Sequence, residues 1–341
     1  VSLNQWVDNP NSPKQVKEAL VKLGAKAGSS TDKDSLEYLL KTAEGDLREF
    51  VIKMLVWRKE AKLHGTYVKG ITKRLYDGRV HPSFLLHGTT TGRLSCRNPN
   101  LQNVPRESSI RKMFIPESGN VFVQADYKTA ELRVVCALAQ DETLAAMLAP
   151  DRDIHSEVAE RFFGPGFTKD QRVRAKAVVF GLTYGRTAFD LAMEYEMTTK
   201  EAQVYLDTWF GLIPKTVEWR DSVKTSIVEK QVDLVSPFGR HRRFWLITED
   251  NSKDVVKEGL AFLPQSTASD INVAAACRLR NLGLDVKLLV HDSCLVECKE
   301  EDAERVAKLM TEVMEQTAVD LFTDFVPFPV DVKIGYNWGE V

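Results

Sequence analysis

Two aspartates stand at the ends of strand-like segments that lie far apart in the sequence. Asp126 closes the alternating run NVFVQAD, and Asp292 lies at the polar tip between two β-like runs in DVKLLVHDSCLVEC. If the two strands lie side by side, the carboxylates converge and repel each other unless a cation such as Mg²⁺ lies between them. Two such ions could activate a hydroxyl and neutralise a leaving pyrophosphate. From these two residues alone, helix capping and turn formation remain the more ordinary explanation.

A stripe of four side chains in RVRAKAVVFGLTYG is more informative. Arg172, Lys176, Phe180 and Tyr184 recur at every fourth residue. On a helix this spacing gives a slowly drifting stripe about 18 Å long, cationic in its first half and aromatic in its second. A nucleoside triphosphate has the same polarity, with phosphates at one end and a flat base at the other. An amphipathic helix with aromatic core residues and solvated basic residues explains the stripe equally well.

The remaining sequence predicts the elements that must position these residues. Residues 14–74 read as helices with breaks, and short β-like runs with turn residues begin near Asp77. Residues 141–229 are almost entirely helix-patterned. After SPFGRHRR we expect two more helical runs, followed by the two β-like runs around Asp292. A final helix from about Glu301 and the strand-like VPFPVDVKIG close the chain.

Composition limits the class of protein. The chain has 341 residues, of which 43% are hydrophobic and 28% charged, so two or three subdomains of a soluble protein are expected. No apolar run approaches the roughly 20 residues of a membrane span, so we expect no membrane partner. The five cysteines form no CxxC pair, and the first residues lack a signal-peptide pattern. We therefore expect a cytoplasmic protein, or one of an organelle or host cell interior, and not a secreted one.

Three segments in order carry a resemblance to a known family. VQADYKTAELRVV, RVRAKAVVFGLTYG and LLVHDSCLVEC resemble the first palm motif, the fingers-helix motif and the third motif of the family A DNA polymerases. The resemblance implies that Asp126 and Asp292 are catalytic. They would bind two Mg²⁺ ions together with the backbone carbonyl of Tyr127, and Mn²⁺ could replace Mg²⁺. The matches run from about Ser2 to the C-terminal GYNWGEV, so they cover nearly the whole chain.

The resemblance also implies how substrates are held. Six residues would bind the incoming dNTP: Arg172, Lys176, Phe180, Tyr184, Glu131 and His155. Glu131 would exclude a ribose 2′-hydroxyl, and Tyr184 would pack against it. Five residues would contact the primer and template: Arg93, Asn100, Gln102, Gln265 and His291. Primer-template DNA and dNTPs are therefore the expected partners.

The fold implied by the resemblance is a right-hand polymerase fold of the α+β class. It combines an antiparallel palm sheet with helical fingers and a partial helical thumb. The expected domains are a partial thumb at 1–75, the first part of the palm at 76–140, the fingers at 141–250 and the second part of the palm at 251–341. The implied reaction adds dNMP from dNTP to a primer 3′-hydroxyl and releases pyrophosphate.

The sequence also departs from the family pattern. Ser293 stands where the family usually has Glu, Ala261 where Asn is common, Lys257 where Arg is common, and Ala130 where a larger aliphatic residue is normal. Only about 75 residues precede the expected palm, which is too few for an exonuclease domain of roughly 150 to 200 residues. We expect no exonuclease domain within these residues, and an upstream exonuclease or a processivity factor outside them is compatible with the resemblance.

Two other functions fit part of the pattern. A single-subunit RNA polymerase shares the Asp, Lys and Tyr framework, but Glu131 placed against the 2′-hydroxyl favours dNTP. A non-catalytic DNA-binding subunit on the same fold would be expected to have lost a metal ligand, and both aspartates are present.

Overall fold

The chain forms two compact units, residues 1–81 and 82–341. A computed structural model describes residues 2–26, 30–105, 109–195 and 197–341, with residues 180 and 182–184 described by their backbone only. In these stretches no helix is long and apolar enough to cross a membrane. The domain boundaries expected at residues 75, 140 and 250 remain predictions.

The first unit is helical, as its sequence pattern predicts. Its elements are α1 (Pro13–Lys22), α2 (Lys33–Leu40), α3 (Gly45–Lys62), the π-helical turn η1 (Leu63–Lys69), α4 (Gly70–Thr72), β1 (Leu75–Tyr76) and β2 (Arg79–Val80). Ser12 and Asp32 cap α1 and α2 by accepting hydrogen bonds from backbone N–H groups of the first turn. A core that includes Leu20, Leu36 and Phe50 holds the helices together.

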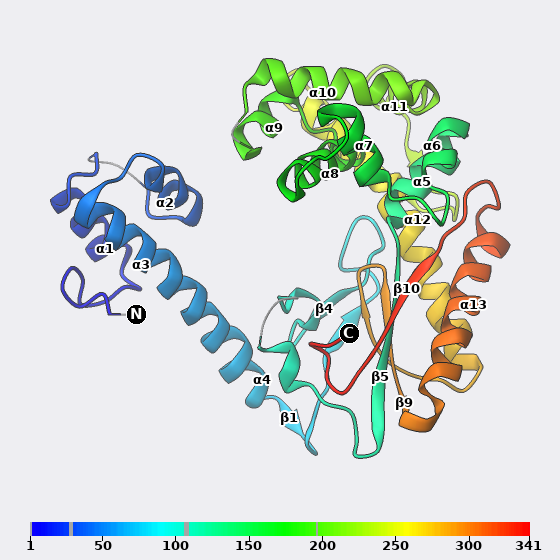
Figure 1. Ribbon diagram of the computed structural model, residues 1–341, viewed down its shortest axis with the longest axis horizontal. Coiled ribbons are helices and arrows are strands. Elements are labelled where there is room, and N and C mark those ends of the chain that lie inside the picture. Colours follow the sequence, from blue (N-terminus) through cyan, green and yellow to red (C-terminus); the bar gives the residue numbers. More distant parts are fainter. Residues whose placement is uncertain (1, 27–29, 106–108, 196) are drawn as a thin grey trace. The chain divides into compact units, whose positions relative to one another are not determined.

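A four-stranded antiparallel sheet is the centre of the second unit (Figure 1). Its strands are β5 (Asn120–Tyr127), β8 (Asp285–Val290), β9 (Ser293–Lys299) and β10 (Val330–Gly335), arranged in the order β10-β5-β9-β8. Strands from the middle and the end of the chain therefore lie side by side. The sheet confirms the predicted pairing of the segment that ends at Asp126 with the segment that follows Asp292.

Helices cover one face of this sheet. The helices α5 (Ala130–Ala139), α12 (Ser252–Asn281) and α13 (Ala303–Leu321) share one core with the strands. Figure 1 shows α12 and α13 beside the sheet. Side chains alternate along a strand, so Val123, Ala125 and Tyr127 point into this core. Half-buried Gln124 and Asp126 point to the opposite face. The alternation thus places an acidic side chain on the face that the helices leave open.

The second unit also contains several short elements. They are β3 (Ser83–Leu85), β4 (Ser95–Arg97), the 3₁₀ turns η2 (Leu101–Asn103) and η3 (Arg111–Met113), and further along the chain β6 (Leu234–Val235), β7 (His241–Arg242) and the 3₁₀ turn η4 (Glu300–Asp302). Each of the two strand pairs β3-β4 and β6-β7 is antiparallel.

A block of helices separates β5 from β8. It contains α6 (Glu142–Met147), α7 (Ile154–Phe163), α8 (Lys169–Tyr184), α9 (Ala188–Tyr195), α10 (Thr199–Leu212) and α11 (Pro214–Val228). Capping boxes at Thr168 and Thr198 start α8 and α10, and Pro214 occupies the first turn of α11. The predicted helical block is confirmed, and the predicted stripe lies on the single helix α8.

The expectation of two helical runs after SPFGRHRR is wrong. One helix, α12, runs over 30 residues and carries Pro264 in its interior. Proline removes one helical hydrogen bond and normally ends or kinks a helix. Here Pro264, the preceding Leu263 and most of the following two turns are buried, so tertiary packing holds the helix together across the proline.

Candidate active site

Asp292 lies in a two-residue turn between β8 and β9. Val290 pairs with Ser293, so His291 and Asp292 form the whole connection. His291 has φ of +54°, in the left-handed region that residues other than Gly adopt at a cost. This short, strained turn lies at the end of the hairpin formed by β8 and β9. The structure thereby confirms the predicted polar tip.

Asp126 lies on the strand next to this turn. It pairs with Ser293, the residue that follows Asp292, and the backbone N–H of Tyr127 donates to the carbonyl oxygen of Asp292 at 3.2 Å. Both aspartates are half-buried. Residues on paired strands lie about 5 Å apart, so the two acidic residues predicted from distant segments come together in the fold.

The donor set around the aspartates suits Mg²⁺. Both side chains offer hard carboxylate oxygens, whereas Cys294 on β9 belongs to the core on the other face of the sheet. The described residues contain no group of three or more His, Cys, Asp or Glu side chains that could hold a metal alone. Two carboxylates plus carbonyl, water and phosphate oxygens form the usual Mg²⁺ set in phosphoryl-transfer enzymes.

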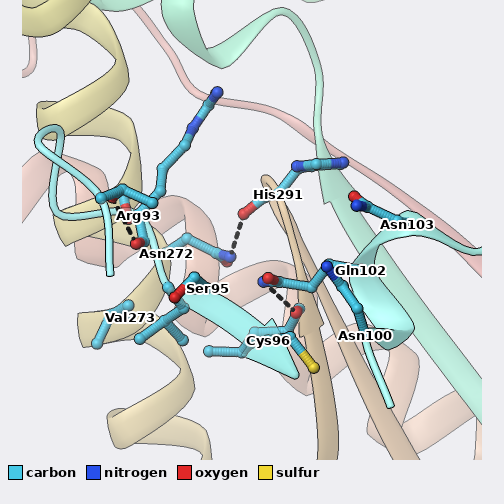
Figure 2. Close-up of a pocket in the computed structure, with 13 residues that line it drawn as sticks. Arg93, Ser95, Cys96, Asn100, Gln102, Asn103, Asn272, Val273 and His291 are labelled. Carbon is cyan, nitrogen blue, oxygen red and sulfur yellow. Dashed lines mark hydrogen bonds between the residues drawn. The ribbon is translucent and has the colours of Figure 1, made fainter. Parts of the chain in front are cut away.

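A pocket of about 240 Å³ opens beside the turn (Figure 2). Four of the five predicted primer and template residues line it: Arg93, Asn100, Gln102 and His291. Ser269 and Asn272 of α12 line it as well. The fifth predicted residue, Gln265, is half-buried on α12 one turn before Ser269, on the same helical face. Two segments of the second unit that lie far apart in the sequence, residues 89–103 and 269–291, therefore meet at one pocket.

Arg93 is held in place by the loop that carries it. Gly92 precedes it with φ of +76°, and a Cβ there would lie 2.2 Å from Cζ of Arg240. A Cβ would displace this guanidinium, and the positive φ by itself favours glycine. The hydroxyl of Ser269 on α12 donates to the carbonyl oxygen of Gly92 at 3.4 Å, which fastens the loop to α12.

Arg93 and Glu131 form an ion pair that sequence reasoning did not foresee. Arg93 Nη2 donates to Glu131 Oε1, and the side chains are 26% and 9% exposed. Glu131 lies in the first turn of α5, where a carboxylate also suits the helix dipole. The predicted gate residue and the predicted primer-contact residue are therefore neighbours.

The predicted triphosphate-binding residues come from two packed helices. Arg172 and Lys176 lie on α8, and His155 lies on α7, which packs against α8. Arg172 Nη2 donates to Asp153 Oδ2 at 2.8 Å, and Asp153 also caps α7. The side chains of Phe180 and Tyr184 lie outside the described part of the structure, so only their backbone places them on α8.

The surroundings of the His155 side chain lower its pKa. Burial lowers its pKa to about 4; Lys176 and Arg172 add to this lowering, and Asp153 opposes it. His155 is only 7% exposed and is neutral in the folded chain at pH 7. The two cations that lower this pKa are the ones expected to bind phosphate, so the three predicted residues share one electrostatic environment.

Folding stability is expected to fall between pH 6.5 and 4 because of His155. Its ordinary pKa is 6.5, so in this window the unfolded chain binds a proton that the folded chain excludes. The loss should reach about 3 kcal/mol at pH 4 and vanish above pH 6.5. Urea unfolding of His155→Gln should show a smaller loss between pH 7 and 5 than the parent. Substitution of the exposed His87 by Gln should leave the parent's loss unchanged, and equal losses in parent and His155→Gln would refute the assignment.

Two buried side chains near the site carried no signal in the sequence. Arg133 is 4% exposed and donates to the backbone carbonyls of Lys128, Leu148 and Pro327. Asn272 is 2% exposed and donates to the turn at His291. Neither local pattern nor spacing marks such residues. Asp153 could have been found, because an aspartate directly before a helical run is a capping signal.

Comparison with known proteins agrees with the geometry. The family model described as DNA polymerase family A matches residues 3–340. The chain is 34% identical to DNA polymerase I of Caldicellulosiruptor bescii, covering 98% of this chain and 41% of that protein. It is 35% identical to the thermostable DNA polymerase I of Thermus aquaticus, covering 97% of this chain and 42% of that protein. The chain thus spans about two fifths of the length of these relatives.

A solved structure has the same fold. The POL domain of Pol1 from M. smegmatis, in complex with DNA primer-template and dNTP, superposes with a TM-score of 0.85 at 27% identity, covering 98% of this chain and 62% of that chain. This likeness confirms the predicted right-hand polymerase fold of the α+β class. The chain therefore belongs to DNA polymerase family A.

Proposed function

We propose that this chain is a DNA-directed DNA polymerase that adds dNMP from dNTP to a primer 3′-hydroxyl. One observation supports this above all others: strands β5 and β9 bring Asp126 and Asp292 together on the sheet of a family A polymerase fold. The names of the relatives, DNA polymerase I, and the primer-template and dNTP bound by the Pol1 domain support the same substrates. The subdomain boundaries at 75, 140 and 250 belong to this proposal.

The chain's own residues have distinct tasks in this reaction. Asp126, Asp292 and the backbone carbonyl of Tyr127 would hold two Mg²⁺ ions, or Mn²⁺ in their place. When bound, such ions lower the pKa of the attacking hydroxyl and neutralise the leaving pyrophosphate. Asp126 lies on β5 and Asp292 in the two-residue turn that joins β8 to β9, so the sheet sets their positions before substrate arrives.

The dNTP is held from the helical block. Arg172 and Lys176 bind the triphosphate with charge-assisted hydrogen bonds, and neutral His155 can donate one more. Arg172 already pairs with Asp153, so a triphosphate would share this guanidinium with Asp153 or compete with it. Phe180 and Tyr184, further along α8, pack near the sugar and the nascent base pair.

The pocket beside the turn receives the end of the primer. Arg93 and Gln265 present donors to the minor-groove side of the duplex, Asn100 and Gln102 lie along the duplex, and His291 lies next to the primer terminus. Polar side chains of this kind read the acceptors that all base pairs share in the minor groove, which suits contact without sequence preference.

Primer extension tests the proposed function directly. The purified chain with Mg²⁺, dNTPs and a primed DNA template should extend the primer, and EDTA should abolish extension. A primed RNA template in a parallel reaction separates DNA copying from RNA copying. A chain that binds primed DNA but never extends it would favour the non-catalytic DNA-binding alternative.

Glu131 should decide between deoxyribonucleotides and ribonucleotides. Its side chain is buried, and replacement by Ala opens space for a 2′-hydroxyl whose overpacking would otherwise cost about 1 to 3 kcal/mol. Glu131→Ala should therefore raise the kcat/KM for rNTP relative to dNTP by roughly 10- to 100-fold.

A matched variant separates size from charge at this position. Glu131→Gln keeps the volume but weakens the pairing with Arg93, so it should retain most of the discrimination. If the Ala and Gln variants admit rNTPs equally, sugar selection depends on the ion pair between Glu131 and Arg93 and not on the volume of the Glu131 side chain. If neither variant changes the selection, Glu131 is not the gate.

A further inference from the structure

The turn that carries Asp292 is fastened at every carbonyl. Each of the five consecutive carbonyl oxygens from Leu289 to Ser293 accepts a hydrogen bond. The donor to Asp292 is the backbone of β5, and the donor to Val290 is the hydroxyl of Ser293 at 2.8 Å. The others come from side-chain amides of distant segments, so the turn is not held by its own strands alone.

Two of these amides reach the turn from opposite sides of the pocket (Figure 2). Gln102 Nε2, in η2, donates to the carbonyl of Leu289 at 3.2 Å. Asn272 Nδ2, on α12, donates to the carbonyl of His291 at 3.0 Å and makes a longer contact of 3.5 Å with that of Ser293. The group of Asn272 that faces the turn must be its NH₂, since only a donor can face two carbonyl oxygens.

The Asn272 amide therefore contacts the backbone on both sides of Asp292. Its two acceptors are the residues directly before and after the aspartate, and its side chain is 2% exposed. Water has little access to this amide, and a donor lost from a buried carbonyl is costly. Because His291 is held at φ of +54°, the turn has a strained residue that surrounding contacts must keep in place.

We infer that Asn272 is a positioning residue for Asp292: its amide clamps the backbone on both sides of the aspartate and thereby fixes where the carboxylate points. The inference rests on the proposed role of Asp292 as a ligand of divalent ions. Partners that orient a metal ligand commonly change metal affinity by 10- to 100-fold when they are removed.

The test compares three variants of the full chain. Asn272→Leu removes both donors and keeps a similar volume, and Asn272→Ser is a smaller change in case the leucine variant does not fold. Asn281→Leu is the control, because Asn281 is exposed at the C-terminal end of the same helix. Circular dichroism establishes that each variant is folded before it is used.

Two measurements that do not depend on turnover test whether Asn272 positions Asp292. Hydrogen exchange of the Tyr127 amide should be faster in the Asn272 variants, because this amide donates to Asp292 within the loosened turn. The Mn²⁺ dissociation constant with primer-template DNA present, measured from the free-ion EPR signal, should rise about 10-fold. In extension assays kcat should fall while KM for dNTP stays unchanged, since the triphosphate-binding residues are untouched.

The outcomes separate this inference from the proposed function. A parent that extends primers, with Asn272 variants that keep parental exchange and Mn²⁺ affinity, overturns the inference alone. A parent that does not extend primers, with variants that still bind Mn²⁺ more weakly, overturns the polymerase proposal and supports the clamp. A parent that neither binds Mn²⁺ nor extends primers overturns both.

Discussion

Asp292→Ala is expected to reduce primer extension by about 10³-fold or more. Loss of one carboxylate should weaken the binding of both proposed ions. Metal ions at such sites stabilise the charge of the transition state by several kcal/mol, and each 1.36 kcal/mol corresponds to a tenfold change in rate. Single-turnover extension of a primed template at saturating dNTP measures the effect on the chemical step. The fold should survive, because the side chain sits half-buried at a turn and not in the core.

A matched control uses the other end of the same hairpin. Asp285 begins β8 and is exposed, and Asp285→Asn changes the charge of the hairpin by the same amount without touching the turn. We expect its extension rate to equal the parent's. Comparable loss in both variants would mean that charge on the hairpin, and not ligation by Asp292, controls the rate.

Arg133→Met is expected to lower the free energy of unfolding by about 3 to 5 kcal/mol. The guanidinium bonds to three carbonyls at 2.6 to 2.8 Å, from the segment after β5, the end of α6 and the segment before β10. Burial lowers the pKa of Arg133 to about 10, so it is still charged at pH 7. Methionine fills the space but leaves three acceptors without their donor, each costing roughly 1 kcal/mol or more.

The measurement is chemical unfolding followed by circular dichroism. Arg278→Met is the matched control, because Arg278 is 36% exposed and pairs with Asp320 at the surface. That substitution should cost less than about 1 kcal/mol. Arg133→Lys should fall between parent and Met variant, since one ammonium keeps the charge but cannot span three segments. A Met variant as stable as the parent would show that the three carbonyls find other donors.

Much of the fold could be predicted from patterns along the chain. Alternation in NVFVQAD predicted β5, because one face of this strand is more buried than the other. The two β-like runs that meet at a polar tip predicted β8 and β9. The helix α8 followed from the four-residue spacing of the stripe, and the structure adds the capping box at Thr168. What failed was the continuity of α12: local sequence cannot show that packing around Pro264 outweighs the missing hydrogen bond.

The candidate site was predictable only in part. Motifs named the aspartates, the α8 cations and four of the pocket residues, and the structure brings each of these groups together. The pairing of Arg93 with Glu131 was not predictable, because it joins residues 38 positions apart through tertiary contact alone. Asn272 and Arg133 act on backbone carbonyls, which every residue possesses, so no sequence pattern reveals their partners.

The central claim is that Asp126 and Asp292 hold divalent ions together. A crystal of the chain with primer-template DNA, a non-hydrolysable dNTP and Mn²⁺, measured for anomalous scattering of manganese, tests it most directly. We predict two manganese peaks within coordination distance of both carboxylates. Peaks elsewhere in the chain, with the two carboxylates directed away from each other, would contradict the account.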